Sequence, residues 1–530
     1  MTDRRASAII VGEFREILVW PLRLDLDCRA GKGEVAAGHA ATIGALDADR
    51  RWEPVQRLLG HLAPGGATTS EAEYKEFVYF HPFVRRFLYG EGDAAPMRLY
   101  RRLGLRAVEL CLCNDVTGPF RVRLAVDRCN LYVLDSGNAV LALEVSAGSV
   151  RRGAVRPAMI ETAAGTEEPM SLAHAQVILE RFRRAYPPYW HEGGAGLAPR
   201  MVGWIGDGGE RWHCMPTPAD GTAHIECCGQ PPVAGHWRDI LAPLVFDGGT
   251  DGPRWLQVVD DRIPVIAFVA IDDAGTITEG DWVRLAMLDD AGNSPRPYGA
   301  GFPSAFDDAY CYDAFWDPAA NDKTTRYLMS GHGFVAIGNG GDPFFANVVV
   351  DHVRRHYFQM GLIAHVQTAA LLTLSYRLAR AVERMDDREP AAEILADVIT
   401  FTHRTWFPQV SGHVQAREIH ARWRRHLGVD GLHDAVMREA QGLAAFLDGR
   451  AERKRADEAE RLNRIAVTGL IPAVATGFLG MNILIKGKDE AKWIVADIPD
   501  VLLTLAGTAV VLGLLAWLVN KVWAWRGWKR

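Results

Sequence analysis

Cysteine and histidine residues gather in one short stretch of the chain, and their side chains are the usual ligands of zinc. The 24 residues from His213 to His236 also hold Cys214, His224 and Cys227. Cys214, His224, Cys227 and His236 together could bind Zn²⁺ tetrahedrally. Their spacing matches no standard zinc finger, so a zinc site and ordinary hydrogen-bonded loop residues both stay open as interpretations.

Carboxylates are concentrated between residues 247 and 326, where fifteen Asp or Glu residues stand against six Lys or Arg. Adjacent pairs carry much of this pattern: Asp260-Asp261, Asp272-Asp273, Asp289-Asp290 and Asp307-Asp308. Carboxylate oxygens are the ligands that hard cations such as Mg²⁺ prefer. Acids at exposed turns produce the same composition without binding an ion, and this interpretation is favoured.

Two glycine-rich runs invite comparison with a phosphate-binding loop: Gly331-His332-Gly333 and Gly338-Asn339-Gly340-Gly341. Neither shows the order of strand, glycine loop and helix with the Lys-Ser/Thr ending of such a loop, so both are interpreted as hairpin turns. The sequence also lacks the Gly-x-Ser-x-Gly and His-Glu-x-x-His motifs of hydrolases and zinc proteases. It therefore predicts no enzymatic activity.

Two uncharged segments near the C-terminus, 465–485 and 501–520, have the character of membrane-spanning helices. They hold 21 and 20 residues without a charged side chain, and about 20 apolar residues cross a hydrocarbon core. Arg453-Lys454-Arg455 precedes the first segment and Lys521 follows the second, which predicts that both termini are cytoplasmic. The alternative is two core helices of a soluble protein. The aromatic residues expected at the membrane interfaces are Trp493, Trp517, Trp523, Trp525 and Trp528.

The first uncharged segment ends in Gly480-Met481-Asn482, preceded by Thr476-Gly477-Phe478-Leu479. With a long charged helix before it and a short loop and second span after it, this part of the chain resembles the CorA family of divalent-cation channels. The resemblance implies a homopentamer in the inner (plasma) membrane, with Mg²⁺ or another divalent cation as substrate and possible regulator. It also implies that Gly480, Met481 and Asn482 form the selectivity filter, where amides can hydrogen-bond the waters that Mg²⁺ retains. Helix-packing glycines and an interfacial asparagine are the alternative.

The remaining side chains on the Asn482 face are the expected pore lining. At about 100° per residue, Thr468, Ile471 and Ala475 share this face of the helix. Thr476 would join them only in a bent helix. Apolar Ile471 and Ala475 would form a constriction that gates by excluding water, and Thr468 would add a ring of hydroxyl groups.

Two features depart from the family pattern. Arg464 falls on the pore face, where a guanidinium group would oppose cation flow, unless it points to the lipid headgroups or pairs with Glu460 one turn earlier. Asp489 and Glu490 are the expected cation contacts of the outer loop, but three lysines between residues 486 and 492 weaken the attraction. The family resemblance further implies that cytosolic carboxylates bind Mg²⁺ and close the channel, although no acid here matches a family motif.

Mixed strand and helix patterns fill the part of the chain before these segments, so we expect an α/β (α+β) cytosolic domain over residues 1–342. A continuous helical pattern from 344 to 384 contains an apolar centre, 360–376, for which a buried helix is favoured over a membrane span. The expected elements of the domain are a strand within 7–25, a hairpin at 121–145, strands within 255–271 and 325–337, and helices at 71–89 and 171–186.

The expected organisation after residue 342 is helical throughout. Hardly any helix-breaking residue interrupts 431–485, which predicts one helix too long to fold back into a compact domain. In order, the expected segments are a helical subdomain (343–430), a stalk helix (431–464), a first transmembrane helix (465–485), an outer loop (486–500), a second transmembrane helix (501–520) and a basic cytosolic tail (521–530).

Composition limits the class of protein. The 530 residues are 48% hydrophobic and 23% charged, with a net charge of −6, which excludes a disordered or small disulfide-rich protein and gives no reason to expect nucleic-acid binding. No signal peptide is expected, so the eight cysteines are interpreted as reduced cytosolic thiols. The sequence predicts a CorA-like divalent-cation channel that needs no cofactor; its partners are the lipid bilayer and copies of itself. The alternative is a CorA-like membrane effector whose enlarged cytosolic domain binds a ligand or protein.

Overall fold

Two units make up the chain in the computed structural model, Met1–Gln441 and Gly442–Arg530. The division falls inside a long helix. The structure describes residues 9–25, 32–55, 71–90, 95–151, 156–186, 198–214, 233–246, 253–299, 301–302, 305–320, 323–383 and 388–485, with single residues between 506 and 521.

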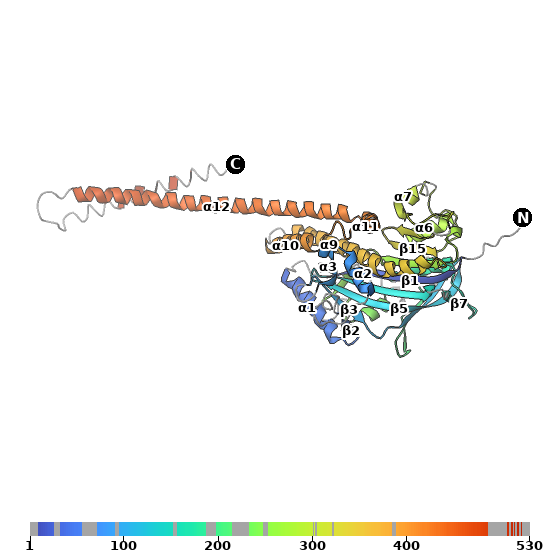
Figure 1. Ribbon diagram of the computed structural model, residues 1–530. Coiled ribbons are helices and arrows are strands. Elements are labelled where there is room, and N and C mark those ends of the chain that lie inside the picture. Colours follow the sequence, from blue (N-terminus) through green and yellow to red (C-terminus); the bar gives the residue numbers. More distant parts are fainter. Residues whose placement is uncertain are drawn as a thin grey trace. The chain divides into compact units, whose positions relative to one another are not determined.

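A mixed sheet of 15 strands forms the centre of the first unit (Figure 1). Its main path runs β10-β9-β4-β5-β6-β1-β12-β15-β14-β13. Strands β12 and β15 pair in parallel, and β1 pairs antiparallel with both β6 and β12. The expectation of a mixed α/β domain is therefore confirmed. The strands on this path are β1 (Val11–Leu24), β4 (Ala107–Asn114), β5 (Gly118–Leu134), β6 (Asn138–Gly148), β9 (Met201–Ile205), β10 (Arg211–Cys214), β12 (Val265–Ile271), β13 (Cys311–Tyr312), β14 (Arg326–Met329) and β15 (Gly333–Asn339).

Five short strands lie off this path. Strand β11 (Trp255–Gln257) pairs with β1, and β3 (Met97–Arg102) pairs with β5 and with β2 (Trp52–Pro54). Strand β7 (Met159–Thr162) pairs with β5 and with β8 (Glu167–Pro169). The expected strand at 255–271 is thus two strands, β11 and β12, which pair with β1 at different places.

The expected hairpin at 121–145 is confirmed as β5 and β6. Gly137 in its turn has a φ of 79°, a left-handed conformation that glycine adopts without the steric cost borne by other residues. The pairing continues from Val133 opposite Ala139 to Ala125 opposite Ser146, with one irregularity between Val126 and Arg128. A β-bulge bends a strand at such a place, and here it separates two differently covered halves of β5.

The glycine run at 331–333 is the turn between β14 and β15, as expected. Gly333 begins β15, where an added Cβ would lie 2.3 Å from the carbonyl oxygen of Val265, so the parallel pairing with β12 requires glycine there. The interpretation of 338–341 as a hairpin turn is wrong. This run follows strand β15 and leads into a helix beginning at Phe345, so the order of strand, glycines and helix exists, without the Lys-Ser/Thr ending.

Helices expected from the sequence are mostly confirmed, with different ends. The helix expected at 71–89 is two helices, α2 (Glu71–Tyr79) and α3 (Pro82–Tyr89), because Pro82 begins a new helix and cannot donate the hydrogen bond that would continue the old one. Helix α4 (Leu172–Arg181) is capped by Ser171, whose hydroxyl accepts a hydrogen bond from the backbone N–H of His174. The others before residue 343 are α1 (Lys32–Ala48), α5 (Gly235–Leu241), η4 (Ala274–Thr276), α6 (Glu279–Met287) and α7 (Phe306–Tyr310).

The sheet separates two hydrophobic cores. One core includes Trp20 of β1 and Trp237 of α5, whose rings meet edge to face at 5.7 Å. The other includes Phe268 of β12, whose ring stacks at 4.6 Å on Phe345 from the first helical turn after β15. Strand β12 is buried along its whole length, as a continuous apolar strand is when both faces of a sheet are covered.

The helical stretch after β15 packs against the second core. Two π-helical turns, η6 (Phe345–Val349) and η7 (Val353–Tyr357), flank α8 (Val350–His352) and lead into α9 (Phe358–Glu383). Many apolar side chains of α9, among them Met360, Leu362 and Ile363, are fully buried, and α9 contacts β1 and β6. The apolar stretch at 360–376 is therefore a core helix, as favoured. Helices α10 (Arg388–Arg404) and α11 (Val414–His426) follow it.

Helix α12 runs unbroken from Val429 to Ile485, 57 residues and about 85 Å at 1.5 Å per residue. The long helix expected from 431 is confirmed. Among the residues that the structure describes, no helix combines the length and the apolar character needed to cross a membrane. The expected outer loop at 486–500 and most of the expected second span at 501–520 lie outside the described residues, so the transmembrane hairpin and its segment boundaries stay predictions.

Candidate functional site

Two of the side chains expected near the pore are described, and both are bonded within α12. The Thr468 hydroxyl donates to the carbonyl oxygens of Arg464, at 2.7 Å, and Ile465, at 3.1 Å. A guanidinium nitrogen of Arg464 donates to a carboxylate oxygen of Glu460 at 2.8 Å. The alternative proposed for Arg464, pairing one turn earlier in the helix, is therefore confirmed, and its charge is partly neutralised within the chain.

The other residues of the predicted filter and pore are placed only by position. Gly480, Met481 and Asn482 lie near the end of α12, after Ile471, Ala475 and Thr476 of the same helix. The side chains of these residues lie outside the described part of the chain, as do Asp489 and Glu490 of the outer loop. Their predicted roles are untested.

Of the four zinc-ligand candidates, only the side chain of His236 is described. It is buried in α5, and burial lowers the pKa of its imidazole to about 3. Within the described residues, neither ring nitrogen has a hydrogen-bond partner. Cys214 ends strand β10, but its side chain lies outside the described part, together with all of His224 and Cys227. The zinc site therefore stays a prediction with one candidate ligand placed.

Several of the paired aspartates of 247–326 form ion pairs with arginines or cap a helical turn. Asp290 pairs with Arg181 and Asp261 with Arg184, whereas Asp273 caps the helical turn η4 through the N–H of Gly275. These contacts fit the favoured interpretation as turn and surface acids.

Asp307, Cys311 and Asp313 form the one described group whose ligand atoms lie within 4.8 Å of one another. Burial raises the pKa of the Cys311 thiol well above its ordinary value, which opposes the thiolate that a metal would need. The guanidinium group of Arg326 pairs with Asp313 at 2.8 Å and also with Asp307. A cation already occupies the place between the carboxylates, so this group is a structural ion-pair cluster.

A network of charges is buried around β1, on the side of the sheet that α9 covers. The Glu144 carboxylate pairs with Arg128 at 2.8 Å, Arg15 at 3.1 Å and Arg354 of η7. Burial alone would raise the pKa of Glu144, but these three arginines hold it below its ordinary value. Since the network joins β1, β5, β6 and η7, it fixes the helical layer to the sheet.

Glu16, which neighbours this network in sequence, faces the opposite core. It is fully buried, and within the described residues neither carboxylate oxygen has a hydrogen-bond partner. Burial raises its pKa to about 8, although the charge of Arg183 acts in the opposite direction. Glu16 is therefore protonated at neutral pH, because a lone buried carboxylate is costly.

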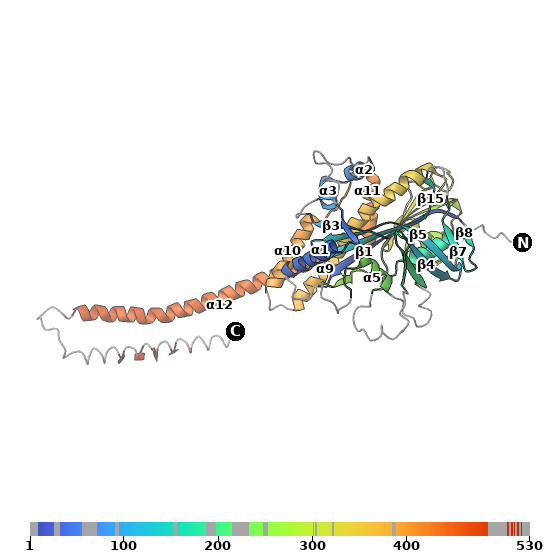
Figure 2. The same ribbon diagram turned by 90° about the horizontal axis from the view of Figure 1, so that it is seen from below.

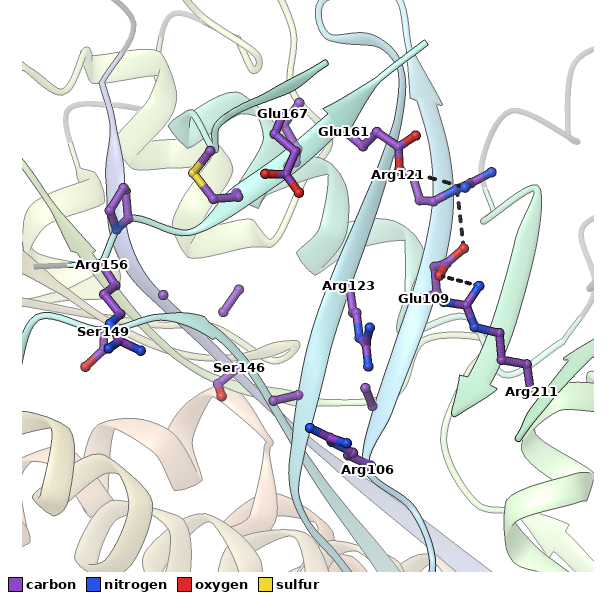
Figure 3. Close-up of a pocket in the computed structure, with 17 residues that line it drawn as sticks. Arg106, Glu109, Arg121, Arg123, Ser146, Ser149, Arg156, Glu161, Glu167 and Arg211 are labelled. Carbon is purple, nitrogen blue, oxygen red and sulfur yellow. Dashed lines mark ion pairs between the residues drawn. The ribbon is translucent and has the colours of Figure 1, made fainter. Parts of the chain in front are cut away.

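A pocket of about 950 Å³ opens on the first unit, on the face of β4 and β5 that none of the described helices covers (Figure 3). In β5, exposed and buried residues alternate up to Asp127, whereas the strand is buried from Cys129 onward. Figure 2 shows β4, β5, β7 and β8 together at one end of the sheet. The first half of β5 is thus a half-covered strand that presents every second side chain to the pocket.

Five arginines and three glutamates line this pocket. Glu109 is largely buried and pairs with Arg121 at 3.4 Å and Arg211 at 3.8 Å, and Arg121 also lies 3.8 Å from Glu161. These pairs use two of the glutamates. The other charged lining residues are Arg106, Arg123, Arg156 and Glu167.

The sequence interpretation overlooked this pocket. The signal was present in the alternation Arg121, Val122, Arg123, Leu124, which marks a strand with one polar face. Such a face is ordinary for an antiparallel sheet. What distinguishes it here, the convergence of charges from β7, β8 and β10, depends on which strands become neighbours.

Comparison with models of known protein families finds no match to this chain, and a search of curated proteins finds no matching relative.

Proposed function

We propose that this chain is the subunit of a CorA-like membrane channel that conducts divalent cations, with Mg²⁺ as the expected ion. In this proposal the first transmembrane helix is 465–485 and lines an oligomeric pore, with Gly480, Met481 and Asn482 at its outer end. The unit Met1–Gln441 is cytoplasmic and controls the pore.

The exposed apolar surface at the end of α12 is the observation that carries this proposal. Leu462, Ile465 and Leu470 are 68%, 59% and 65% exposed, and the sequence from 465 to 485 holds no charge. Burying a leucine side chain is worth about 1.5–3 kcal/mol relative to leaving it in water. A helix that is apolar on every side needs lipid or other protein around it.

The charged stretch before this surface supports a stalk that meets a membrane surface. From Glu452 to Arg464 the described side chains of α12 are exposed, and Glu460 pairs with Arg464 within the helix. Such a helix keeps its charges in water up to the point where the apolar segment begins. That change of character is expected where a stalk meets a membrane surface, with basic residues on the cytoplasmic side.

The first test asks whether the chain is embedded in a membrane and conducts ions. We expect the full-length protein to stay in the membrane fraction after alkaline extraction and to pass Mg²⁺ or Co²⁺ into liposomes. Asn482→Ala should change the flux of ions, because the amide ring that holds hydrated cations is lost. Asn520→Ala is the matched control, since it removes an asparagine from the second expected span and should leave selectivity unchanged.

Extraction of the intact protein by alkali, as a soluble species, would refute the membrane proposal. A membrane-bound protein that passes none of Mg²⁺, Co²⁺, Ni²⁺ or Zn²⁺, and whose behaviour Asn482→Ala leaves unchanged, would refute the channel proposal while keeping the membrane attachment.

The alternative function is a membrane effector whose first unit binds a ligand. The arginine-lined pocket favours it, because an enlarged domain with a built cavity has a use beyond supporting a pore. Flux that appears only after a ligand is added to the liposome assay would support the effector, whereas constitutive flux controlled by the cation alone would support the simple channel.

A further inference from the structure

The pocket on the uncovered half of the sheet has a floor made of small side chains. Ala107 of β4 lies opposite Ala125 of β5, and Ala125 lies opposite Ser146 of β6. These three residues form one cross-strand row, and all three line the pocket. Because opposite residues in a sheet project to the same face, a row of short side chains leaves room above the strands.

Long basic side chains surround this floor. Figure 3 shows Arg106 and Arg123 on one side of Ser146, and Arg156 with Ser149 on the other. Glu109 and Glu161 are engaged by Arg121 and Arg211, as described above. Among the described residues that line the pocket, one further carboxylate, Glu167, borders the space that the remaining arginines meet.

The state of these three arginines is the second observation. Within the described part of the chain, Arg106, Arg123 and Arg156 form no ion pair with any carboxylate, unlike Arg121 and Arg211 beside them. Three like charges facing one hollow repel one another, and the repulsion is relieved when an anion enters. Guanidinium groups bind phosphate through two parallel hydrogen bonds.

We propose that this pocket binds a small molecule that carries two or more phosphate groups, which lie between Arg106, Arg123 and Arg156. A volume of about 950 Å³ is at the upper end of the range of small-molecule sites, roughly 300–1,000 Å³. Pro157 and Met159 are exposed and line the same pocket, so they offer an apolar surface for the organic part of the ligand. This proposal does not depend on the channel function.

The experiment is calorimetric titration of the full-length protein in detergent at about 0.15 M salt, where screening suppresses weak surface attraction. The probes are inorganic triphosphate, ATP and citrate. We expect triphosphate and ATP to bind one site per chain, and citrate to bind about tenfold more weakly or not at all. Tighter binding of ATP than of triphosphate would assign the apolar surface to the organic part.

Two variants remove arginines from the pocket, one removes an arginine outside it as a control, and one adds a negative charge to its floor. Arg106→Gln and Arg123→Gln should each weaken triphosphate binding about tenfold, the loss expected from a charge-assisted hydrogen bond. Both side chains are exposed, so folding should be preserved. Arg101→Gln is the matched control, because Arg101 is an exposed arginine on β3 that does not line the pocket. Ala125→Glu, which places a carboxylate on the floor, should abolish binding.

Several results would overturn the proposal. Triphosphate that does not bind, or that binds equally well after Arg123→Gln or Ala125→Glu, would exclude the site. Equal loss in Arg101→Gln would show attraction by general surface charge. Citrate that matches triphosphate would replace phosphate by a polycarboxylate ligand. Tighter binding of a single-stranded oligonucleotide through the same arginines would assign a nucleic-acid surface instead. None of these results affects the flux assay.

Discussion

The two units of this chain differ in how far their apolar side chains are exposed. In Met1–Gln441 they fill two cores, one on each face of the sheet, so that residues such as Leu362 of α9 are fully buried. In Gly442–Arg530 Leu443 is buried, but farther along the chain several described apolar residues are exposed, among them Leu470 of α12 and Trp517. The same helical geometry carries leucine in both places, so helix formation alone does not determine how an apolar surface is covered.

The units differ equally in their charges. Glu144 in the first unit is buried and pairs with three arginines from different elements, whereas Glu460 of α12 pairs with Arg464 of the same helix and remains half exposed. The network around Glu144 holds several elements of the first unit together, whereas the pair of Glu460 and Arg464 connects two turns of one helix. The buried network therefore depends on how distant segments pack, whereas the helix pair depends only on residues one turn apart.

The largest expected effect separates these two kinds of charge. Glu144→Gln should lower the free energy of unfolding by about 3–5 kcal/mol, because it leaves Arg15, Arg128 and Arg354 near an uncharged partner. Glu460→Gln should change it by less than about 0.5 kcal/mol, since exposed helix pairs contribute little. Urea denaturation followed by tryptophan fluorescence measures both. Equal effects would mean that the buried network does not join helix to sheet.

The next prediction compares two leucines, both in helices. Leu362→Ala should cost about 2–5 kcal/mol in the same denaturation experiment, because it leaves a cavity in the second core. Leu470→Ala should change the free energy of unfolding by less than about 0.5 kcal/mol. It should instead reduce the amount of protein that resists alkaline extraction from membranes. A destabilisation by Leu470→Ala equal to that by Leu362→Ala would show that α12 is buried against its own chain.

The last prediction is a dependence of stability on pH that belongs to the first unit alone. Burial lowers the pKa to about 3 for His236 and His420, and to about 4 for His356 and His365. The unfolded chain takes up protons below about pH 6.5 and the folded chain does not, so stability falls as the pH decreases from there. Each histidine contributes at most about 1.4 kcal/mol per pH unit.

Glu16 acts in the opposite direction, because its pKa is raised to about 8. Its contribution to stability is lost as the pH rises from the unfolded value of 4.5 toward 8. Protonation of the unfolded histidines at low pH and ionisation of the unfolded Glu16 side chain at higher pH together place the maximum of the free energy of unfolding at about pH 6.5. Near-ultraviolet circular dichroism between pH 4 and 8 measures the packing of the first unit. Residues 442–530 contain no histidine, so the part of the far-ultraviolet helix signal that comes from α12 should persist, and complete loss of the helix signal together with this packing would contradict the assignment.

Local signals in the sequence predicted several elements correctly. Asp135-Ser136-Gly137-Asn138 placed the hairpin of β5 and β6, because glycine permits the turn that the neighbouring strands need. Ser171 placed the beginning of α4 through a hydrogen bond that spans three residues. Both features depend on residues close together in the chain, where the chemistry of a few side chains decides the conformation.

Some failures were local. The helix expected at 71–89 is broken at Pro82, a signal already present in the sequence, and the glycine run at 338–341 leads into a helix rather than a hairpin. The candidate site at 480–482 was predicted from a motif and its setting, and it is still a prediction. The pocket was missed because Arg106, Arg123 and Arg156 have no motif that connects them.

The sequence by itself determined the long helix α12, because 57 residues with a single internal proline and few glycines favour one continuous helix whatever surrounds it. It also determined where charge gives way to an apolar segment, since that change is written in the order of residues. Only the tertiary structure decided that Ala107, Ala125 and Ser146 form one row beneath the arginines. Strand neighbours are chosen by the packing of whole faces, and that choice is cooperative over the entire sheet.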